Sequence, residues 1–237
     1  DPSELPEGYP TTYTHENAVT LPVPTRTGYE FLGWYVDGEF NGNAVIEIPE
    51  NQTEDKEFFA KWSDAVEYSI TYDLDDGTND VDNPVSYTVE TETITLKDAV
   101  KNGYTFDGWF NESGVQVTTV AGGATGNIEL TAKWTPVEYT ITYENVNGAT
   151  NDNATTYTIE QTVPLNALEK DGFAFRGWFT NAQFTGDPVI DISAGASGDT
   201  TFYAKWLEIF TITYAAGNDE GVTGEVAAGT KTETENA

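Results

Sequence analysis

Cysteine is absent from the 237-residue sequence, and His15 is its single histidine. Without thiols the chain can form no disulfide, iron–sulfur cluster or thiolate zinc site, and one histidine cannot build a multi-histidine metal site. No apolar run approaches the ~20 residues that a membrane-spanning helix needs. These absences exclude thiol chemistry and predict that the chain does not insert into a membrane.

Basic residues are scarce, since ten Lys and Arg stand against 40 Asp and Glu, for a formal net charge of −30. Such a chain repels phosphate backbones and anionic lipid, so we expect no binding to nucleic acid or to a membrane surface. The 31 aromatic residues, 13% of the chain, are too many for a disordered acidic tail. We therefore expect an acidic surface around folded aromatic cores.

Methionine is absent too, and no affinity tag is visible. Asp1 is therefore not an initiator residue, and we expect that a leader has been removed from the chain. Removal of a leader indicates export, which predicts an extracellular protein of the cell surface.

Three markers divide the chain into repeats of about 70 residues. A Gly-aromatic marker occurs as GYEFLGWY from Gly28, GYTFDGWF from Gly103 and GFAFRGWF from Gly172. A second marker closes each repeat with Ala-Lys-Trp, and a third reads Ile-Thr-Tyr; each recurs every 71 or 72 residues. They end at Trp62, Trp134 and Trp206, and at Tyr72, Tyr143 and Tyr214. Three independent markers with one period predict a tandem array.

The second and third markers have the alternation of strands. Tyr68, Ile70 and Tyr72 alternate with polar residues, which is the period of a half-buried strand. A further strand is expected near Tyr87 and its counterpart Tyr157. The aromatic residues of each repeat are expected to form its core.

A short helix is expected in each of the two later repeats, in the segments ITLKDAVKNGY and VPLNALEKDGF. Leu96 and Val100 in one segment, and Leu165 and Leu168 in the other, have helical spacing, and a glycine follows as a stop signal. In the first repeat two prolines oppose a regular helix. The predicted fold class is therefore β-rich α+β.

The string G-Y-x-F-x-G-W-[YF], followed by [FL]-x-A-K-W and Y-T-I-T-Y, resembles the Listeria/Bacteroides repeat, also called the internalin B-type repeat, over residues 9–214. The resemblance implies small β-grasp-like (ubiquitin-like) domains in tandem, arranged as a rod, in exported, surface-attached bacterial proteins. It implies no enzymatic activity and no catalytic residues.

A strand inventory shows an imbalance between the two ends of the chain. We predict repeat 1 at residues 1–64, repeat 2 at 65–136, repeat 3 at 137–207, and a C-terminal strand with a polar tail at 208–237. Repeat 1 lacks the opening strand that the Ile-Thr-Tyr marker supplies to the others, whereas the tail carries an unmatched one. If the opening strand is central, repeat 1 exposes an edge and an apolar groove that recruit a strand.

We predict that Phe210, Ile212 and Tyr214, which share one face of the unmatched strand, fill that groove in the next molecule and give a head-to-tail homopolymer. Two alternatives stay open. The chain ends are cuts in a longer array of neighbouring repeats, or the strand closes onto repeat 1 of the same chain.

An acidic loop follows the opening strand of repeat 2. Its carboxylates are Asp73, Asp75, Asp76, Asp80 and Asp82. Several oxygens on a tight loop suit calcium, but the EF-hand spacing is not met, and an Asp-Gly hairpin loop explains the same residues. Calcium is thus a weak prediction, and no other cofactor is expected.

The sequence predicts a non-enzymatic extracellular structural protein that assembles by strand complementation into a cell-surface fibre or sheath. Small repeats leave little room for a ligand pocket of ~300–1,000 Å³, and no nucleophile elbow, P-loop or dinucleotide motif occurs. The alternative is an adhesin or stalk segment that binds a glycan or host ligand through exposed aromatics. Burial of Trp34, Trp109 and Trp178 would favour the structural role.

Overall fold

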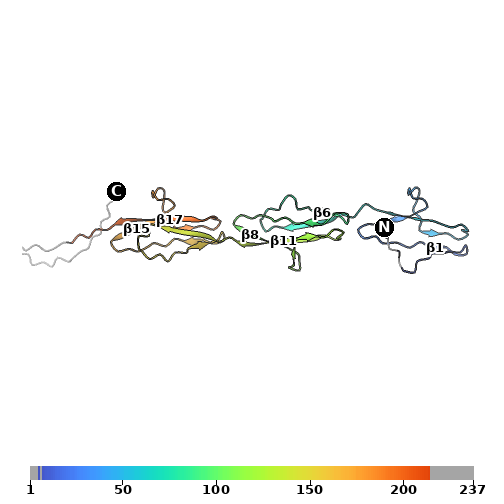
Figure 1. Cartoon of the computed structure of the whole chain (residues 1–237), viewed down its shortest axis with the longest axis horizontal. Helices are drawn as coiled ribbons and strands as arrows, with labels where there is room; N and C mark the ends of the chain where they lie inside the picture. Colours follow the sequence, from blue (N-terminus) through green and yellow to red (C-terminus); the bar gives the residue numbers. More distant parts are fainter. Residues whose placement is uncertain (1–4, 6, 214–237) are drawn as a thin grey trace, which may run out of the picture. The chain divides into compact units, whose positions relative to one another are not determined.

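The computed structural model describes residues 5 and 7–213, and all of their regular structure is β-strand (Figure 1). The chain divides into two compact units, Asp1–Lys101 with Phe106–Trp134, and Asn102–Thr105 with Thr135–Ala237. In the described residues there is no helix long and apolar enough to cross a bilayer.

Repeat 2 is built on a five-stranded sheet. Its strands are β5 (Tyr68–Asp73), β6 (Ser86–Tyr87), β8 (Tyr104–Phe110), β9 (Gln116–Val117) and β11 (Ile128–Pro136). Their order is β6-β5-β11-β8-β9, and β5 runs parallel to β11. A two-stranded sheet joins β7 (Ile94–Thr95) to β10 (Thr119–Val120). The opening strand of the repeat is therefore central, as expected.

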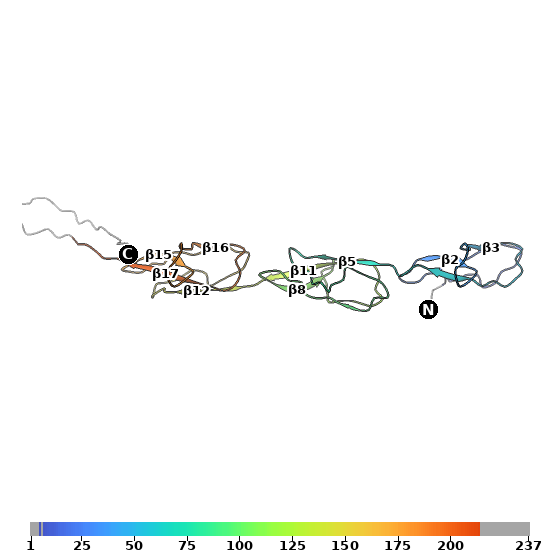
Figure 2. The same cartoon turned by 90° about the horizontal axis from the view of Figure 1, so that it is seen from above.

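Repeat 3 has the same plan. Its strands are β12 (Tyr139–Glu144), β13 (Thr156–Tyr157), β15 (Phe173–Phe179) and β17 (Thr200–Glu208). Their order is β13-β12-β17-β15, with β12 parallel to β17, and β15 and β17 lie side by side in both ribbon views (Figure 2). A small sheet pairs β14 (Val163–Pro164) with β16 (Asp191–Ile192).

Repeat 1 has two small sheets and no central parallel pair in the part of the chain that the structure describes. Its strands are β1 (Val19–Thr20), β2 (Phe31–Tyr35), β3 (Glu47–Ile48) and β4 (Phe59–Trp62). β1 pairs with β3, and β2 pairs with β4.

The predicted α+β class with β-grasp-like domains is wrong, because neither expected helix forms within residues 5 and 7–213. In repeat 2 the Lys97 carbonyl accepts hydrogen bonds from Asn83 Nδ2 at 2.9 Å and from Trp109 Nε1 at 2.8 Å. The Lys97 N–H donates to Asn83 Oδ1 at 2.7 Å. Long-range side chains thus occupy the backbone groups that a helix would pair locally.

Repeat 3 repeats this network around Asn166. Its carbonyl accepts from Asn153 Nδ2 at 3.1 Å and Trp178 Nε1 at 2.9 Å, and its N–H donates to Asn153 Oδ1 at 2.6 Å. Leu165 and Leu168 are buried from a non-helical segment. Their helical spacing was a coincidence of core-facing positions.

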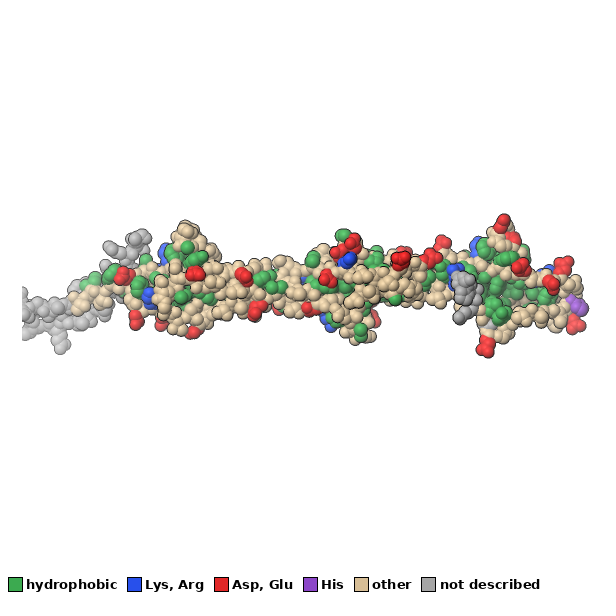
Figure 3. Space-filling model, in the orientation of Figure 1, with side chains coloured by type: hydrophobic (Ala, Val, Ile, Leu, Met, Phe, Trp, Pro, Cys, Tyr) green, Lys and Arg blue, Asp and Glu red, His purple; other side chains and the backbone are tan. Residues whose placement is uncertain are grey.

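Aromatic residues form the cores of repeats 2 and 3, as the composition predicted. Trp109 is 2% exposed and Trp178 is 1% exposed. Each tryptophan makes an edge contact with the phenylalanine three residues before it, at 5.3 Å for Phe106 and 5.4 Å for Phe175. Acidic side chains are scattered over the visible surface, with few basic ones between them (Figure 3).

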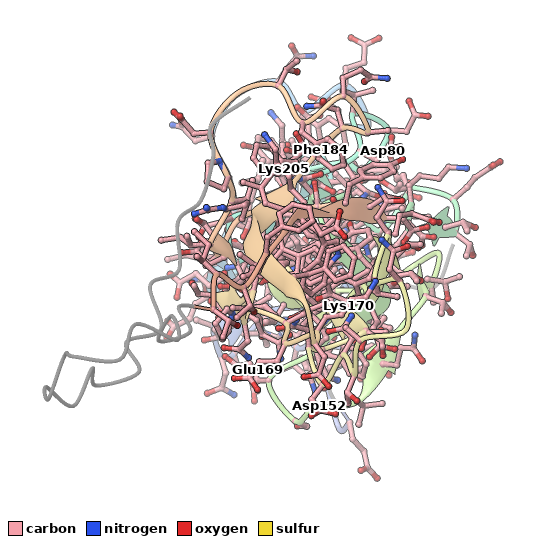
Figure 4. All side chains as sticks on the ribbon, turned by 90° about the vertical axis from the view of Figure 1, so that its left-hand side faces the viewer. Asp80, Asp152, Glu169, Lys170, Phe184 and Lys205 are labelled. Atoms are coloured by element: carbon pink, nitrogen blue, oxygen red, sulfur yellow. The ribbon has the colours of Figure 1, made fainter. Side chains whose placement is uncertain are left out.

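The lysine of each Ala-Lys-Trp segment lies over aromatic rings. Lys133 Nζ is 4.1 Å from the Phe110 ring centroid, and Lys205 Nζ is 5.4 Å from that of Phe179. Lys205 also lies 5.9 Å from the Phe184 ring, and the two are labelled side by side in Figure 4. These cation–π contacts explain why a lysine recurs at this position.

We expect Asn153→Ala to lower the free energy of unfolding by about 2 kcal/mol, because it leaves the Asn166 backbone groups without their partners. Urea unfolding followed by circular dichroism measures the loss. Asn43→Ala is the control, since Asn43 is exposed. An equal, small effect of both substitutions would contradict the role of the network.

Stability should fall as the pH rises above ~10. Burial raises the pKa of Tyr72 and Tyr143, and burial followed by nearby charge raises the pKa of Tyr87 and Tyr157. A raised pKa in the folded state favours folding below the unfolded pKa, and this contribution is lost as the pH passes through the folded pKa. Urea unfolding from neutral to strongly alkaline pH, with ultraviolet titration of the phenolates, checks this; a flat profile would contradict it.

Candidate strand-acceptor groove in repeat 1

The opening strand of repeat 2 completes the core of that repeat. Ile70 of β5 is 3% exposed, and its N–H donates to the Val85 carbonyl at 2.8 Å. The Tyr72 ring packs 4.9 Å from the Trp109 ring, and its hydroxyl donates to the Pro84 carbonyl at 2.9 Å. One strand therefore supplies a buried aliphatic side chain, an aromatic contact and main-chain hydrogen bonds.

β12 makes the same contacts in repeat 3. Ile141 is 3% exposed and donates its N–H to the Thr155 carbonyl at 2.8 Å. Tyr143 packs 4.8 Å from Trp178 and donates its hydroxyl to the Ala154 carbonyl at 2.9 Å. The agreement between the two repeats defines what repeat 1 lacks.

Repeat 1 has a groove of about 430 Å³ at this place. Its lining is Pro10, Thr11, Thr12, Tyr13, Val19, Leu21, Ile48, Asp55, Lys56 and Phe58. Tyr13 and Phe58 correspond in the repeat to Tyr87 and Leu130, which flank Ile70 in the core of repeat 2. The groove is thus the site that an opening strand would occupy; we call it the acceptor groove.

Core positions around the acceptor groove are less buried than their counterparts. Trp34 is half-buried, whereas Trp109 and Trp178 are at most 2% exposed. Tyr13 and Leu21 are half-buried too, and their counterparts in repeats 2 and 3 are buried. Trp34 keeps its hydrogen bond to the Pro22 carbonyl, at 2.6 Å. What it lacks, among the described residues, is the tyrosine that packs on its counterparts.

The pairing of β4 differs from that of its counterparts in the same way. β11 and β17 each pair with an opening strand, but β4 pairs only with β2 within residues 5 and 7–213. Trp134 Nε1 donates to the Leu74 carbonyl at 3.1 Å, and Trp206 Nε1 to the Asn145 carbonyl at 2.8 Å. Both acceptors lie two residues after the tyrosine of an opening strand. The described residues give Trp62 no such acceptor.

The predicted donor residues are only partly covered by the structure. Phe210 is 68% exposed and Ile212 is 43% exposed, and residues 209–213 belong to no strand. Tyr214 lies outside the described residues. Two of the three predicted self-assembly residues are thus apolar side chains open to solvent.

The predicted calcium loop is used for turn geometry. Asp75 and Asp76 have positive φ angles of 44° and 63°, and the Gly77 N–H donates to the Leu74 carbonyl at 2.9 Å, so this is a tight left-handed turn. Asp73 accepts the Asp75 N–H, and Asp75 also pairs with Lys101 at 3.0 Å.

The remaining loop carboxylates are not gathered around one point. Asp80 accepts the Asp82 N–H at 2.9 Å as a turn cap. No group of three or more acidic or histidine side chains able to hold a metal occurs in residues 5 and 7–213. Asp73 and Asp80 cap turns, Asp75 pairs with Lys101, and Asp75 and Asp76 form the centre of the left-handed turn.

One expectation from repeat size was wrong. A second hollow of about 510 Å³ lies in repeat 2, lined by Val117, Val120, Asn127 and neighbouring residues. Both hollows have the size of ligand pockets, so size gives no argument about function.

A comparison with known protein families identifies the same three repeats. The sequence profile of the Listeria-Bacteroides repeat domain matches residues 5–61, 68–133 and 139–205. The chain belongs to the Listeria-Bacteroides repeat family. Each match ends within two residues of a closing Ala-Lys-Trp tryptophan, so the family unit ends at β4, β11 and β17.

Two curated relatives come from Evansella cellulosilytica. One, named "Putative Gly-rich membrane protein", is 28% identical over 216 residues, which is 84% of this chain and 23% of the relative. Another, named "Putative membrane protein", is 28% identical over 204 residues, which is 80% of this chain and 30% of the relative. The chain therefore spans less than a third of these relatives. No solved structure matches it significantly.

Repeat 1 should be the least protected repeat in the free chain. We expect the amides of residues 56–59 to exchange with solvent at least about tenfold faster than those of residues 128–131 in β11, because within residues 5 and 7–213 no opening strand pairs with 56–59, whereas β5 pairs with 128–131. Hydrogen exchange at neutral pH, read by mass spectrometry, measures the difference. Equal protection of the two segments in a monomeric sample would argue against a vacant edge.

Proposed function

We propose that this chain is a non-enzymatic structural segment of an extracellular surface protein, and that its repeats join head to tail by strand complementation. The observation that carries the proposal is the acceptor groove of repeat 1, whose lining residues Tyr13 and Phe58 correspond to residues that flank the opening strand in the core of repeat 2. Family membership and the names of the two relatives support a surface role.

The register of the donated strand follows from the complete repeats. Ile70 pairs with Ile128 and Tyr72 with Leu130. In the same register the donor residues Ile212 and Tyr214 face Lys56 and Phe58 of the acceptor. The Tyr214 hydroxyl then donates to the Pro10 carbonyl, as Tyr72 does to Pro84.

The energetics require the whole strand. Burying one large apolar side chain contributes about 1.5–3 kcal/mol, whereas association costs about 4–15 kcal/mol in lost freedom. Main-chain pairing along residues 56–59, with Phe210, Ile212 and Tyr214 buried together, offsets that cost. One inward side chain changed to a charge should therefore abolish assembly.

The glycan-binding alternative has less support. Trp109 and Trp178 are buried in their own repeats and donate their N–H groups to backbone carbonyls. Neither ring presents a face on which a sugar could stack. These two tryptophans support the structural role, whereas Trp34 is half-buried.

The test compares Ile212→Asp with Thr213→Asp in the full chain. The first places a carboxylate in the acceptor groove, and the second places one on the outward face, where its counterpart Thr71 is exposed. We expect filaments or higher oligomers from the wild type and Thr213→Asp, and monomers from Ile212→Asp. Sedimentation and electron microscopy, with chelator present to remove cation bridging, give the readout.

A peptide of residues 208–217 provides the reciprocal experiment. Added in excess, it should occupy the acceptor groove, shorten the assemblies and increase protection of the amides of residues 56–59. The same peptide with Ile212→Asp is the control. Assemblies that persist in Ile212→Asp, or a wild type that stays monomeric at every concentration, would refute strand complementation.

A further inference from the structure

The Gly-aromatic marker of repeat 1 forms a corner that holds a turn of repeat 2 within the first compact unit. The Tyr29 hydroxyl donates to Glu90 Oε1 at 2.6 Å, and the Arg26 guanidinium lies 3.7 Å from the Tyr29 ring centroid. Gly28 has a φ of 76°, and any Cβ there would clash with the Val89 side chain. Glycine is thus required for both conformation and contact.

The corresponding corner of repeat 2 holds the same turn of repeat 3, within the second unit. The Tyr104 hydroxyl donates to Glu160 Oε1 at 3.0 Å. Gly103 has a φ of 77°, and a Cβ there would lie 2.6 Å from Ile159. In both units, the glycine of the corner therefore contacts a branched aliphatic residue, and the tyrosine after it donates a hydrogen bond to a glutamate.

The corner of repeat 3 is built alike, and no described residue covers it. Gly172 has a φ of 77°, and within residues 5 and 7–213 nothing lies within 4 Å of a Cβ placed on it. Its carbonyl accepts the Ile209 N–H at 2.8 Å, as the Gly28 carbonyl accepts that of Val66. Gly172 is exposed, whereas Gly103 is buried and Gly28 is half-buried.

Repeat 1 carries a copy of the docking turn that no described residue covers. His15 and Glu16 occupy the repeat positions of Ile159 and Glu160, and both are exposed. The His15 carbonyl accepts the Asn51 N–H at 2.8 Å, and the Ile159 carbonyl accepts the Gly195 N–H at 2.7 Å. This shared hydrogen bond shows that the two turns are held alike.

We propose that the corner formed by Lys170, Gly172 and Phe173 is a docking surface for the His15–Glu16 turn of a second copy of this chain. The proposal rests on strand complementation, which places repeat 1 of one copy after repeat 3 of another. The corner then contributes a second contact beside the donated strand and sets how the two copies meet.

The chemistry of this junction differs from the internal ones at two points. Phe173 has no hydroxyl to offer Glu16, so Lys170 Nζ, 4.1 Å from the Phe173 ring centroid, is the group of this corner that can pair with the carboxylate. Arg26 and Lys101 hold the same position in the other corners. His15 replaces an aliphatic residue over Gly172. An ion pair in place of a hydrogen bond from a tyrosine makes the junction between copies salt-sensitive.

Disulfide trapping tests the contact directly, because the chain has no cysteine of its own. Asn17→Cys in one copy and Asp171→Cys in another flank the proposed contact and leave its residues intact. Asp187→Cys is the matched control, since it is an exposed aspartate in the loop that carries Phe184, which lies apart from Lys170 in Figure 4. We expect the Asn17/Asp171 mixture to form linked dimers at least tenfold faster than the Asn17/Asp187 mixture.

A second comparison blocks the corner without changing the donor strand. Asn accepts a positive φ, so Gly172→Asn should fold and place a side chain where His15 docks. Gly186→Asn is the control, because Gly186 has a φ of 83° and equally open space. We expect Gly172→Asn to raise the critical assembly concentration at least tenfold and Gly186→Asn to leave it unchanged.

The outcomes separate the two proposals. Assembly that needs Ile212 but shows no Asn17/Asp171 preference and no effect of Gly172→Asn would refute the corner and leave strand complementation standing. Preferential Asn17/Asp171 linkage in a chain that forms no filaments would support the corner alone. Equal linkage rates and no filaments would refute both.

Discussion

The parallel pairing of each repeat's opening strand with its closing strand is the constraint on which the rest of the fold depends. β5 and β12 are interior strands of their sheets, each paired on both sides, and their tyrosines pack on the tryptophan of the Gly-aromatic marker. When that strand is missing, as in the described part of repeat 1, Trp34 and Tyr13 lose burial together. A single strand is therefore the unit whose gain or loss completes or opens a repeat.

Long-range polar contacts hold the segments between the strands. One asparagine per complete repeat, Asn83 or Asn153, binds both backbone groups of a residue 14 or 13 positions away, and a tryptophan N–H shares the same carbonyl. These buried bonds explain how short strands and turns keep a defined shape without a helix. They also link the tryptophan to the segment around Lys97 or Asn166, so the core and the loops are stabilised together.

Much of this architecture was predictable from the sequence, because it depends on the alternation of residues within each strand and on the recurring markers. The alternation in Tyr68, Ile70 and Tyr72 identified the strand and its buried face. The counting of markers predicted a groove in repeat 1, and a groove lined by Tyr13 and Phe58 lies there. The helix prediction failed because Leu165 and Leu168 have a spacing that fits a helical face and also the buried side of an irregular segment. The corner contacts could not be found from the sequence, since Gly28 and Val89 are far apart along the chain.

The sequence by itself determined the repeat period and the positions of the main strands, because each depends on residue order within a short window. Only the tertiary structure decided that the linking segments are not helical, that the lysines of the Ala-Lys-Trp segments lie over aromatic rings, and that Gly103 is covered by Ile159. These features depend on which distant groups meet a backbone carbonyl, a ring face or a glycine. Such competition among partners is settled by packing and is not visible in spacing alone.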